Sequence, residues 1–190
     1  SVTLESGKRV IIVADRGNIA ESLARRLRSR KVKSITLRPA AISADRIKKL
    51  TAEDSIDGVY FLPALDSEPT LSEMTQETWQ QLLEERLYTL YTLIHSLPGQ
   101  PFLVCATRLG GLHGYAPGEV PAPLGGAVSG FAKALAMERP DSLVKVVDFD
   151  RQASGVDIAS RLVAETLHDS AVVEVGYANG LRYSLTQVEK

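Results

Sequence analysis

The stretch "LGGLHGYAPGEVPAPLGGAVSGFAKALAMERPDSLVKVVDF", residues 109–149, shows the order of elements that decides the fold. It follows the apolar run 101–107, contains a Gly- and Ala-rich segment at 124–137, and ends in the apolar run 143–149. Apolar runs without polar alternation are typical of strands covered on both faces, as in parallel sheets. The stretch therefore predicts a strand, a glycine-rich loop, a helix and a second, parallel strand.

The same alternation extends over the whole chain. Further strands are predicted at 9–15, 34–37 and 58–65, and helices are predicted from an N-cap at Asn18, over 43–54, over 72–97 and over 156–167. A closing hairpin is expected to turn at Asn179-Gly180. Strands that alternate with helices predict the fold class α/β, with residues 1–190 forming one degenerate domain. Its architecture is a Rossmann-like doubly wound, mostly parallel sheet with helices on both faces.

Two helices have clear apolar faces. Ile19, Leu23 and Leu27 recur every four residues, which predicts one buried stripe on the first helix. The long helix over 72–97 is expected to end before Pro98-Gly99. Its buried face is expected to consist of Leu82, Leu83, Leu87, Leu90, Tyr91 and Ile94.

The composition is that of an ordinary globular protein, with 44% hydrophobic and 24% charged residues. No apolar run approaches the roughly 18 residues of a membrane span and no signal-peptide pattern is present, so we expect a cytoplasmic protein without membrane contact. The single cysteine, Cys105, is expected to be buried on a strand, and the histidines have no metal-like spacing to it, so no metal site is assigned. Residues 1–4 are expected to form a strand of a chain cut from a longer polypeptide.

Charge is unevenly distributed along the chain. Residues 1–50 contain 13 Lys and Arg against 4 Asp and Glu, a net charge of +9, although the whole chain carries −1. The densest basic segment is "RRLRSRKVK", residues 25–33. It suits either a phosphate- or nucleic-acid-binding patch or a solvated helix end whose cations complement the helix dipole. Because no aromatic residue lies between the arginines, the second interpretation is favoured and no nucleic-acid partner is expected.

The turn after the first strand lacks the glycines that a dinucleotide requires. In dinucleotide-binding folds, a G-x-G-x-x-G sequence lets the backbone approach the pyrophosphate at a helix N-terminus. Here the sequence is "ADRGNIAESLA", in which only Gly17 is a glycine and its neighbours are Asp15, Arg16, Asn18 and Ile19. These side chains would fill the phosphate space and Asp15 would repel phosphates. No cofactor-binding residue is therefore assigned, although Arg16 is able to contact a phosphate.

Three segments carry a resemblance to a known family: "FLVCATRLGG" (102–111), "APLGGAVSGFAKALAMERPDSLVKVVDFD" (122–150) and "EVGYANGLRYS" (174–184). They resemble the short-chain dehydrogenase/reductase superfamily, and more closely the ketoreductase regions of type I polyketide and polyunsaturated-fatty-acid synthases. The resemblance implies a parent protein with two Rossmann-like halves. The C-terminal half binds NADPH and reduces a β-keto thioester on an acyl carrier protein. The N-terminal half, which this chain resembles, is non-catalytic and braces the other.

The resemblance also indicates which catalytic residues are missing. Family reductases use a tyrosine that donates a proton and a lysine one helical turn later that lowers its pKa. These positions fall near Pro123 or Leu124 and near Ala127 or Val128. The proton-relay residue, counted from the start of the long helix, falls on Arg86. The serine that steadies the substrate carbonyl has its nearest matches in Thr107 and Arg108. No catalytic residue is assigned.

Other polar residues of this region have simpler interpretations. Tyr115 is followed four residues later by Glu119, whose charge would raise a phenol pKa, so we interpret Tyr115 as a loop residue and Lys133 as a helix-surface residue. His113 is a possible general base, but no carboxylate stands at a spacing that orients it. His95 and His168 are interpreted as caps of helix C-termini.

Two functions from different classes follow. The first is the non-catalytic half of a ketoreductase region, whose partners are the catalytic half, where NADPH is expected, and an acyl carrier protein. The alternative is a divergent reductase that binds NAD(P)H through Arg16 and the 25–33 cluster and reduces a carbonyl. A third idea is that the loop Gly110–Gly126 binds a nucleotide or an acyl-pantetheine arm, and the residues do not decide this point.

Overall fold

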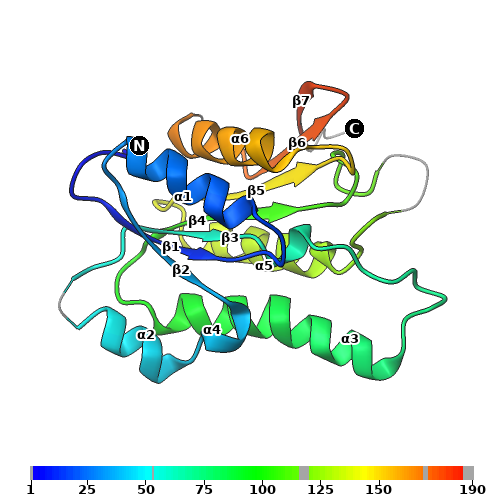
Figure 1. Ribbon diagram of the computed structural model, residues 1–190, viewed down its shortest axis with the longest axis horizontal. Helices are drawn as coiled ribbons and strands as arrows, with labels where there is room; N and C mark the ends of the chain where they lie inside the picture. The colour runs from blue at the N-terminus through cyan, green and yellow to red at the C-terminus, as the bar shows by residue number, and fades with distance from the viewer. Residues whose placement is uncertain (1, 53, 116–119, 169–170, 186–190) are drawn as a thin grey trace.

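The computed structural model describes residues 2–52, 54–115, 120–168 and 171–185, and these residues form a seven-stranded sheet in the order β2-β1-β3-β4-β5-β6-β7 (Figure 1). The pairs from β2 to β6 are parallel, and β7 is antiparallel to β6. The strands are β1 Arg9–Val13, β2 Lys33–Leu37, β3 Gly58–Phe61, β4 Phe102–Thr107, β5 Val144–Phe149, β6 Glu174–Ala178 and β7 Leu181–Ser184.

Helices cover both faces of this sheet, as the sequence predicts (Figure 1). One face carries α1 (Ile19–Ser29) and α6 (Gly155–Leu167). The other face carries α2 (Ala44–Leu50), α3 (Gln76–Leu83), α4 (Thr89–Ser96) and α5 (Gly125–Glu138). Two 3₁₀ turns, η1 (Pro39–Ala41) and η2 (Pro63–Leu65), and a π-helical turn, η3 (Glu84–Tyr88), complete the elements. The predicted doubly wound α/β fold is confirmed.

The apolar runs are continuous because both sides of each central strand face a core. In β1, Val10 and Ile12 pack in the cluster under α1 and α6, whereas Ile11 and Val13 pack in the cluster on the opposite face. The predicted stripe of α1 is buried, with Leu23 and Leu27 fully inaccessible. Alternate residues of one strand therefore supply two separate cores, which leaves no solvent-facing position for polar residues.

Several predicted boundaries are wrong. The long helix begins at Gln76 rather than 72, because the Thr75 side chain accepts a hydrogen bond from Thr78 N at 3.2 Å and caps it there. The third strand ends at Phe61, since Pro63 starts a 3₁₀ turn. The helix predicted over 43–54 spans only Ala44–Leu50. The described residues of the predicted strand 1–4 are not in a strand, although Leu4 is buried in the core.

The buried face of the long helix also differs from the predicted one. A π-helical turn, η3, adds a residue between α3 and α4 and rotates the following turns. As a result Arg86 is buried, Leu83 and Leu87 are half-buried, and Tyr91 is 51% exposed. The buried positions Leu82, Leu90 and Ile94 agree with the prediction.

A buried polar cluster fastens the C-terminal hairpin to α6. The Lys145 ammonium donates to Glu165 Oε2 at 3.1 Å, the Tyr177 hydroxyl donates to Glu165 Oε1 at 2.5 Å, and Arg182 Nε donates to the same oxygen at 2.6 Å. Burial alone would raise the pKa of Glu165, but the hydrogen bonds from Arg182, Tyr177 and Lys145 outweigh it and lower this pKa to about 2. Glu165 therefore accepts hydrogen bonds from residues of three strands, β5, β6 and β7.

Acid is expected to weaken the fold through Glu165. Its folded-state pKa lies below the ordinary value, so its contribution to stability is complete above that value and is lost as the pH falls toward about 2. Chemical unfolding at a series of pH values should give a free energy of unfolding that decreases over this window. Glu165→Gln should be less stable near neutral pH and should show a shallower decrease in acid. Equal slopes for the two proteins would contradict this role of Glu165.

Candidate functional site

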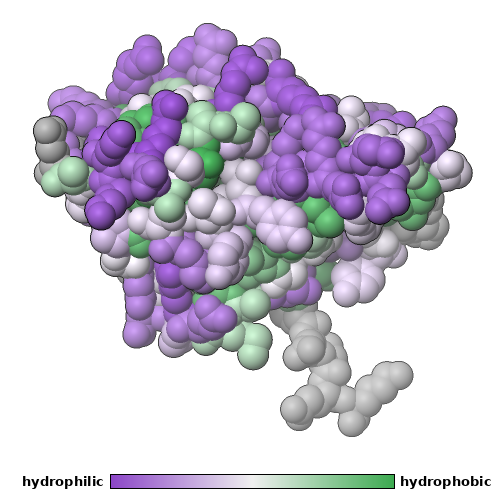
Figure 2. Space-filling view, turned by 90° about the horizontal axis from the view of Figure 1, so that it is seen from below, coloured by the Kyte–Doolittle hydropathy of each residue, from purple (hydrophilic) through white to green (hydrophobic). Residues whose placement is uncertain are grey.

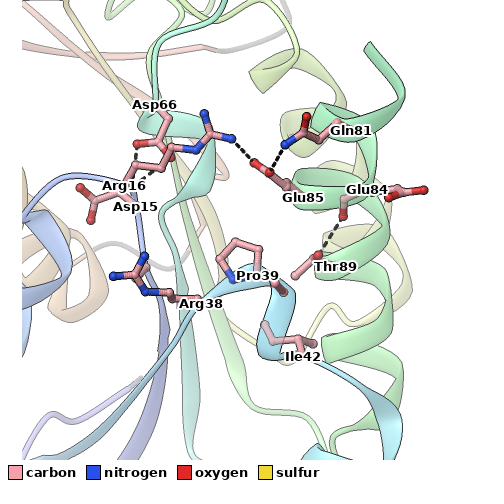
Figure 3. A pocket seen from close by; sticks show the side chains of 12 residues that line it. Asp15, Arg16, Arg38, Pro39, Ile42, Asp66, Gln81, Glu84, Glu85 and Thr89 are labelled. Carbon is pink, nitrogen blue, oxygen red and sulfur yellow. Dashed lines mark hydrogen bonds and ion pairs between the residues drawn. The ribbon is translucent and has the colours of Figure 1, made fainter. Parts of the chain in front are cut away.

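A pocket of about 480 Å³ lies at the carboxyl ends of β1, β2 and β3 (Figure 3). The strand order reverses between β1 and β3, and in open α/β sheets such a switch point is where ligands bind. The pocket is therefore the candidate ligand site of this fold. Its lining consists of Ala14, Asp15, Arg16, Arg38, Pro39, Ala40, Ile42, Asp66, Gln81, Glu84, Glu85 and Thr89.

The N-terminus of α1 is already bound by a carboxylate of the chain. Asp15 is almost fully buried, and its side chain accepts hydrogen bonds from Ile19 N at 3.2 Å and Ala20 N at 2.9 Å. Asn18, the predicted N-cap, makes no side-chain cap hydrogen bond. Asp15 takes this role because its carboxylate reaches back to the first turn and favours the positive end of the helix dipole. Its carboxylate thus occupies the position where a phosphate binds in dinucleotide-binding folds.

A second carboxylate accepts a backbone N–H group of the turn before α1. Asp66, which follows η2, accepts the Arg16 N–H with both of its oxygens, at 2.9 and 3.1 Å. Burial raises the pKa of Asp66, an effect that the Arg16 N–H opposes. A Cβ atom on Gly17 would lie 2.8 Å from Asp15 Oδ2, so this glycine makes room for a side chain rather than for a phosphate. Three backbone donors of the turn thus have partners within the chain.

The charged side chains of the pocket are predominantly acidic. The Arg16 guanidinium extends across the pocket to Glu85 Oε2 at 2.7 Å, and Gln81 also donates to Glu85 (Figure 3). Arg38, which belongs to no motif of the sequence, lies directly after β2 and makes no ion pair with a described residue. The only sequence signal for it was its place after a short strand. Against these two cations the lining contains four carboxylates, which disfavours a polyphosphate.

The 25–33 cluster does not belong to this pocket. Helix α1 runs from the pocket edge of the sheet to the opposite edge, and its 11 residues extend about 16 Å. Arg16 precedes α1, whereas the cluster begins in the second half of α1 and continues beyond its end to Lys33. The lining of the pocket includes Arg16 but none of residues 25–33.

The position of the family's catalytic serine is part of a structural network. Thr107 is fully buried and its hydroxyl donates to Asp148 Oδ1 at 2.7 Å. The same carboxylate accepts Leu109 N at 2.6 Å and His113 N at 2.9 Å. The other predicted match, Arg108, donates to Arg151 O at 2.8 Å. Asp148 therefore holds the loop after β4 and engages the Thr107 hydroxyl.

The glycines of this loop allow close contact between two backbones. A Cβ on Gly111 would lie 2.2 Å from Tyr177 O, and a Cβ on Gly176 would lie 2.1 Å from Gly111 O. The loop therefore packs directly on β6, and substitution at either glycine would separate them. Within the segment Gly110–Gly126, residues 116–119 lie outside the described residues. They include Glu119, whose predicted effect on the pKa of Tyr115 therefore stays a prediction.

The predicted relay position, Arg86, forms a buried ion pair instead of a proton path. Its guanidinium pairs with Glu68 and donates to Asp66 O at 2.9 Å, and burial lowers the pKa of Arg86 to about 10. Glu68 also accepts the N–H of Leu124, one of the expected tyrosine positions, at 3.0 Å. Val128, at the expected lysine position, is buried and apolar. The expected relay and tyrosine positions are thus connected through Glu68, and Val128 lies in the apolar core.

The remaining polar candidates lie around Glu174. Tyr115 is 77% exposed, as expected of a loop residue. Lys133 is on the surface of α5, as predicted, and its ammonium lies 3.3 Å from Glu174 Oε1. His113 Nε2 lies 3.0 Å from Val175 O, and its Nδ1 lies 3.9 Å from Glu174. The sequence shows no carboxylate at a spacing that orients His113, and β6 brings Glu174 near its ring from a distant part of the chain.

Two of three predictions about single side chains are confirmed. His168 Nδ1 lies 2.7 Å from Ala164 O, a carbonyl of the last turn of α6, as its predicted capping role requires. His95 Nδ1 lies 3.0 Å from Tyr91 O, which belongs to the first turn of α4, so His95 does not cap the C-terminus of that helix. Cys105 is fully buried on β4, and burial raises its thiol pKa.

No protein-family model matches the chain, and no curated protein matches it. Solved structures of short-chain dehydrogenase/reductase members share its fold. An oxidoreductase of this family from Burkholderia thailandensis has 16% identity, covers 88% of this chain and 90% of its own, and gives a TM-score of 0.68. A metagenomic short-chain oxidoreductase in complex with NADP has 15% identity, with 94% and 100% covered and a TM-score of 0.67. MalC reductase/Diels-Alderase from Malbranchea aurantiaca has 16% identity, with 90% and 94% covered and a TM-score of 0.70.

These likenesses show that the chain has the Rossmann-like fold of these structures. Among the described helices, none is long and apolar enough to cross a membrane.

Replacing Asp15 is expected to open an anion site at α1. Asp15→Ala leaves the N–H groups of Ile19 and Ala20 without an acceptor and should cost about 0.5–2 kcal/mol of stability. Sulfate should then raise the melting temperature of this variant more than that of the wild type, compared with chloride at equal ionic strength. Asp15→Asn, which keeps an acceptor oxygen, is the control. Identical sulfate responses in all three proteins would contradict the capping role.

Breaking the buried pair of Arg86 and Glu68 is expected to be costly. Arg86→Met leaves Glu68 buried without a countercharge, which should lower the free energy of unfolding by about 3–5 kcal/mol. The double variant Arg86→Met/Glu68→Gln should be more stable than this single variant, since the uncharged amide of the replacement still offers an acceptor oxygen to Leu124 N. Urea unfolding of the four proteins of this cycle measures the coupling. Additive losses would show that the two charges do not stabilise each other.

Proposed function

We propose that this chain is the non-catalytic half of an NADPH-dependent ketoreductase region in a polyketide or fatty acid synthase. Its role is to brace the catalytic half that binds NADPH and reduces a β-ketoacyl group. The proposal combines the reductase fold with the resemblance of segments 102–111, 122–150 and 174–184 to such regions. A cytoplasmic location and an acyl carrier protein as a more distant partner belong to the same proposal.

The observation that carries the proposal is the carboxylate of Asp15 at the N-terminus of α1. It makes hydrogen bonds that a pyrophosphate would need, and Asp66 accepts a further N–H of the turn, that of Arg16. A bound dinucleotide would have to displace two carboxylates that are hydrogen-bonded to backbone. The metagenomic neighbour was solved with NADP, and this chain shares its fold but not a free phosphate-binding turn.

A docking surface for the catalytic half is provided by the outer side of α5. Helix α5 is apolar almost all round, although helices of this kind are usually buried. The side chains that it leaves at least partly accessible include Ala127, Phe131, Ala134 and Met137, and Met137 is 85% exposed. In the view from the side of α2, α3 and α4, pale and green surface lies between hydrophilic flanks (Figure 2). Contact with a second protein would bury this apolar area.

The isolated chain is expected not to bind NADPH. Titration with NADPH, followed by cofactor fluorescence and by the melting temperature of the chain, should give no saturable signal at up to about millimolar concentration. Ketone reduction by the chain, followed as NADPH absorbance, should equal the rate without protein. Saturable binding in the micromolar range would favour the divergent reductase instead.

The bracing role is tested with the catalytic half of the parent synthase. That half should be less stable and less active alone than when it is produced together with residues 1–190, because active-site geometry is sensitive to displacements of about an ångström. Met137→Glu on α5 should weaken the association. Val156→Glu, an exposed apolar residue on the opposite face of the sheet, should leave it unchanged. If the catalytic half alone is as stable and as active as the pair, the role proposed for this chain is wrong.

A further inference from the structure

Strand β2 forms one edge of the sheet, and in the described part of the chain no strand pairs with its outer side. The usual dinucleotide-binding sheet has the order 3-2-1-4-5-6, with a further strand beyond the second. Here the chain runs from β2 through α2 to β3, which pairs with β1 on the inner side. Within the described residues, the place of that outermost strand is open.

The backbone groups that point outward from β2 follow from its pairing with β1. Lys33 N donates to Lys8 O at 2.9 Å, and Leu37 O accepts from Ala14 N at 2.8 Å, so both ends of β2 face β1. Because the direction of backbone groups alternates along a strand, Ser34 and Thr36 direct their N–H and C=O groups outward. Thr36 is exposed and Ser34 is half-buried. Two donors and two acceptors are therefore presented along an accessible edge.

Cations flank this edge on both ends. Arg30, Lys31 and Lys33 lie at its start and Arg38 lies directly after its end, and all four are exposed. None of them forms an ion pair or a side-chain hydrogen bond with a described residue. Lysine on an edge strand repels basic strands and disfavours neutral ones, because its charge would lose water without gaining a partner. A strand that carries carboxylates gains ion pairs there.

We propose that the β2 edge binds an extended, acidic segment of a partner protein, which adds to the sheet as a further strand. Ladder hydrogen bonds to Ser34 and Thr36 provide affinity, and carboxylates paired with Lys33 and Arg38 provide selectivity. A second copy of this chain pairing edge to edge would bring like charges together. The inference is independent of the bracing role, because it does not use α5; Arg38, which also lines the pocket, is the one residue that it shares with the candidate site.

The test uses a fluorescent heptapeptide in which Glu alternates with Val. Its binding to the full chain is measured by fluorescence anisotropy at low salt. The same peptide with N-methyl groups on alternate amides keeps its charge but cannot form the ladder, and it should bind more than about tenfold more weakly. Equal binding of the two peptides would overturn the proposal, because attraction between charges alone would then explain the binding.

A proline variant locates the bound strand on the chain. Thr36→Pro removes an outward N–H that the β1 ladder does not use, so the fold should persist and peptide affinity should fall by at least about fivefold. Ser184→Pro makes the matched change on β7, the opposite edge, and should leave affinity unchanged. Loss of binding in Ser184→Pro but not in Thr36→Pro would overturn the proposal. The far-ultraviolet circular dichroism and the melting temperature of both variants check that they fold.

A charge-reversal pair tests the selectivity. The variant Lys33→Glu/Arg38→Glu should no longer bind the acidic peptide and should bind an analogue in which Lys alternates with Val. Lys48→Glu/Lys49→Glu, an equal change on the exposed side of α2, should retain the acidic peptide. Two outcomes would overturn the proposal: tighter binding of a single-stranded oligonucleotide than of the acidic peptide, or a dimer of the chain that Thr36→Pro dissociates.

Discussion

Carboxylates that accept backbone N–H groups hold the carboxyl edge of the sheet together. Asp15 binds the start of α1, Asp66 binds the turn before it, Glu68 binds the N-terminus of α5, and Asp148 binds the loop after β4. A buried N–H without a partner costs of order 1–3 kcal/mol, so the buried bonds of Asp15 and Asp148 remove a penalty that the topology creates. The same edge is where doubly wound sheets bind ligands. The interactions that complete this fold thus use the donors that a phosphate ligand would need.

Two buried cations, Arg86 and Lys145, complement this arrangement. Each lies among apolar side chains and is paired with a buried carboxylate, Glu68 or Glu165. Such pairs add little net stability, but removal of one partner leaves an uncompensated charge in the core. They also join distant segments, since Arg86 connects the long helix to the loop after β3 and Glu165 connects α6 to the hairpin. Both pairs thus connect elements that are far apart in the sequence.

Two surfaces, on different parts of the molecule, lack a packing or pairing partner within the described residues. The outer side of α5 is apolar and accessible, and the outer edge of β2 has free backbone groups flanked by cations. An apolar helix face favours a broad contact that excludes water, whereas a strand edge favours one extended segment. The two surfaces are therefore suited to different kinds of partner.

The sequence alone determined the strands, most helices and the doubly wound order, because apolar periodicity is a local property. The continuous apolar runs of β1, β4 and β5 are typical of parallel strands that are buried on both faces. It also indicated that the phosphate-binding glycines are absent, since the segment "ADRGN" contains only one glycine. Only the tertiary structure decided the partners of Arg86, Asp66 and His113, because the groups that they contact lie in distant parts of the chain and meet through sheet order. The rotation of the long helix at η3 and the open edge of β2 likewise depend on packing between segments that no local pattern records.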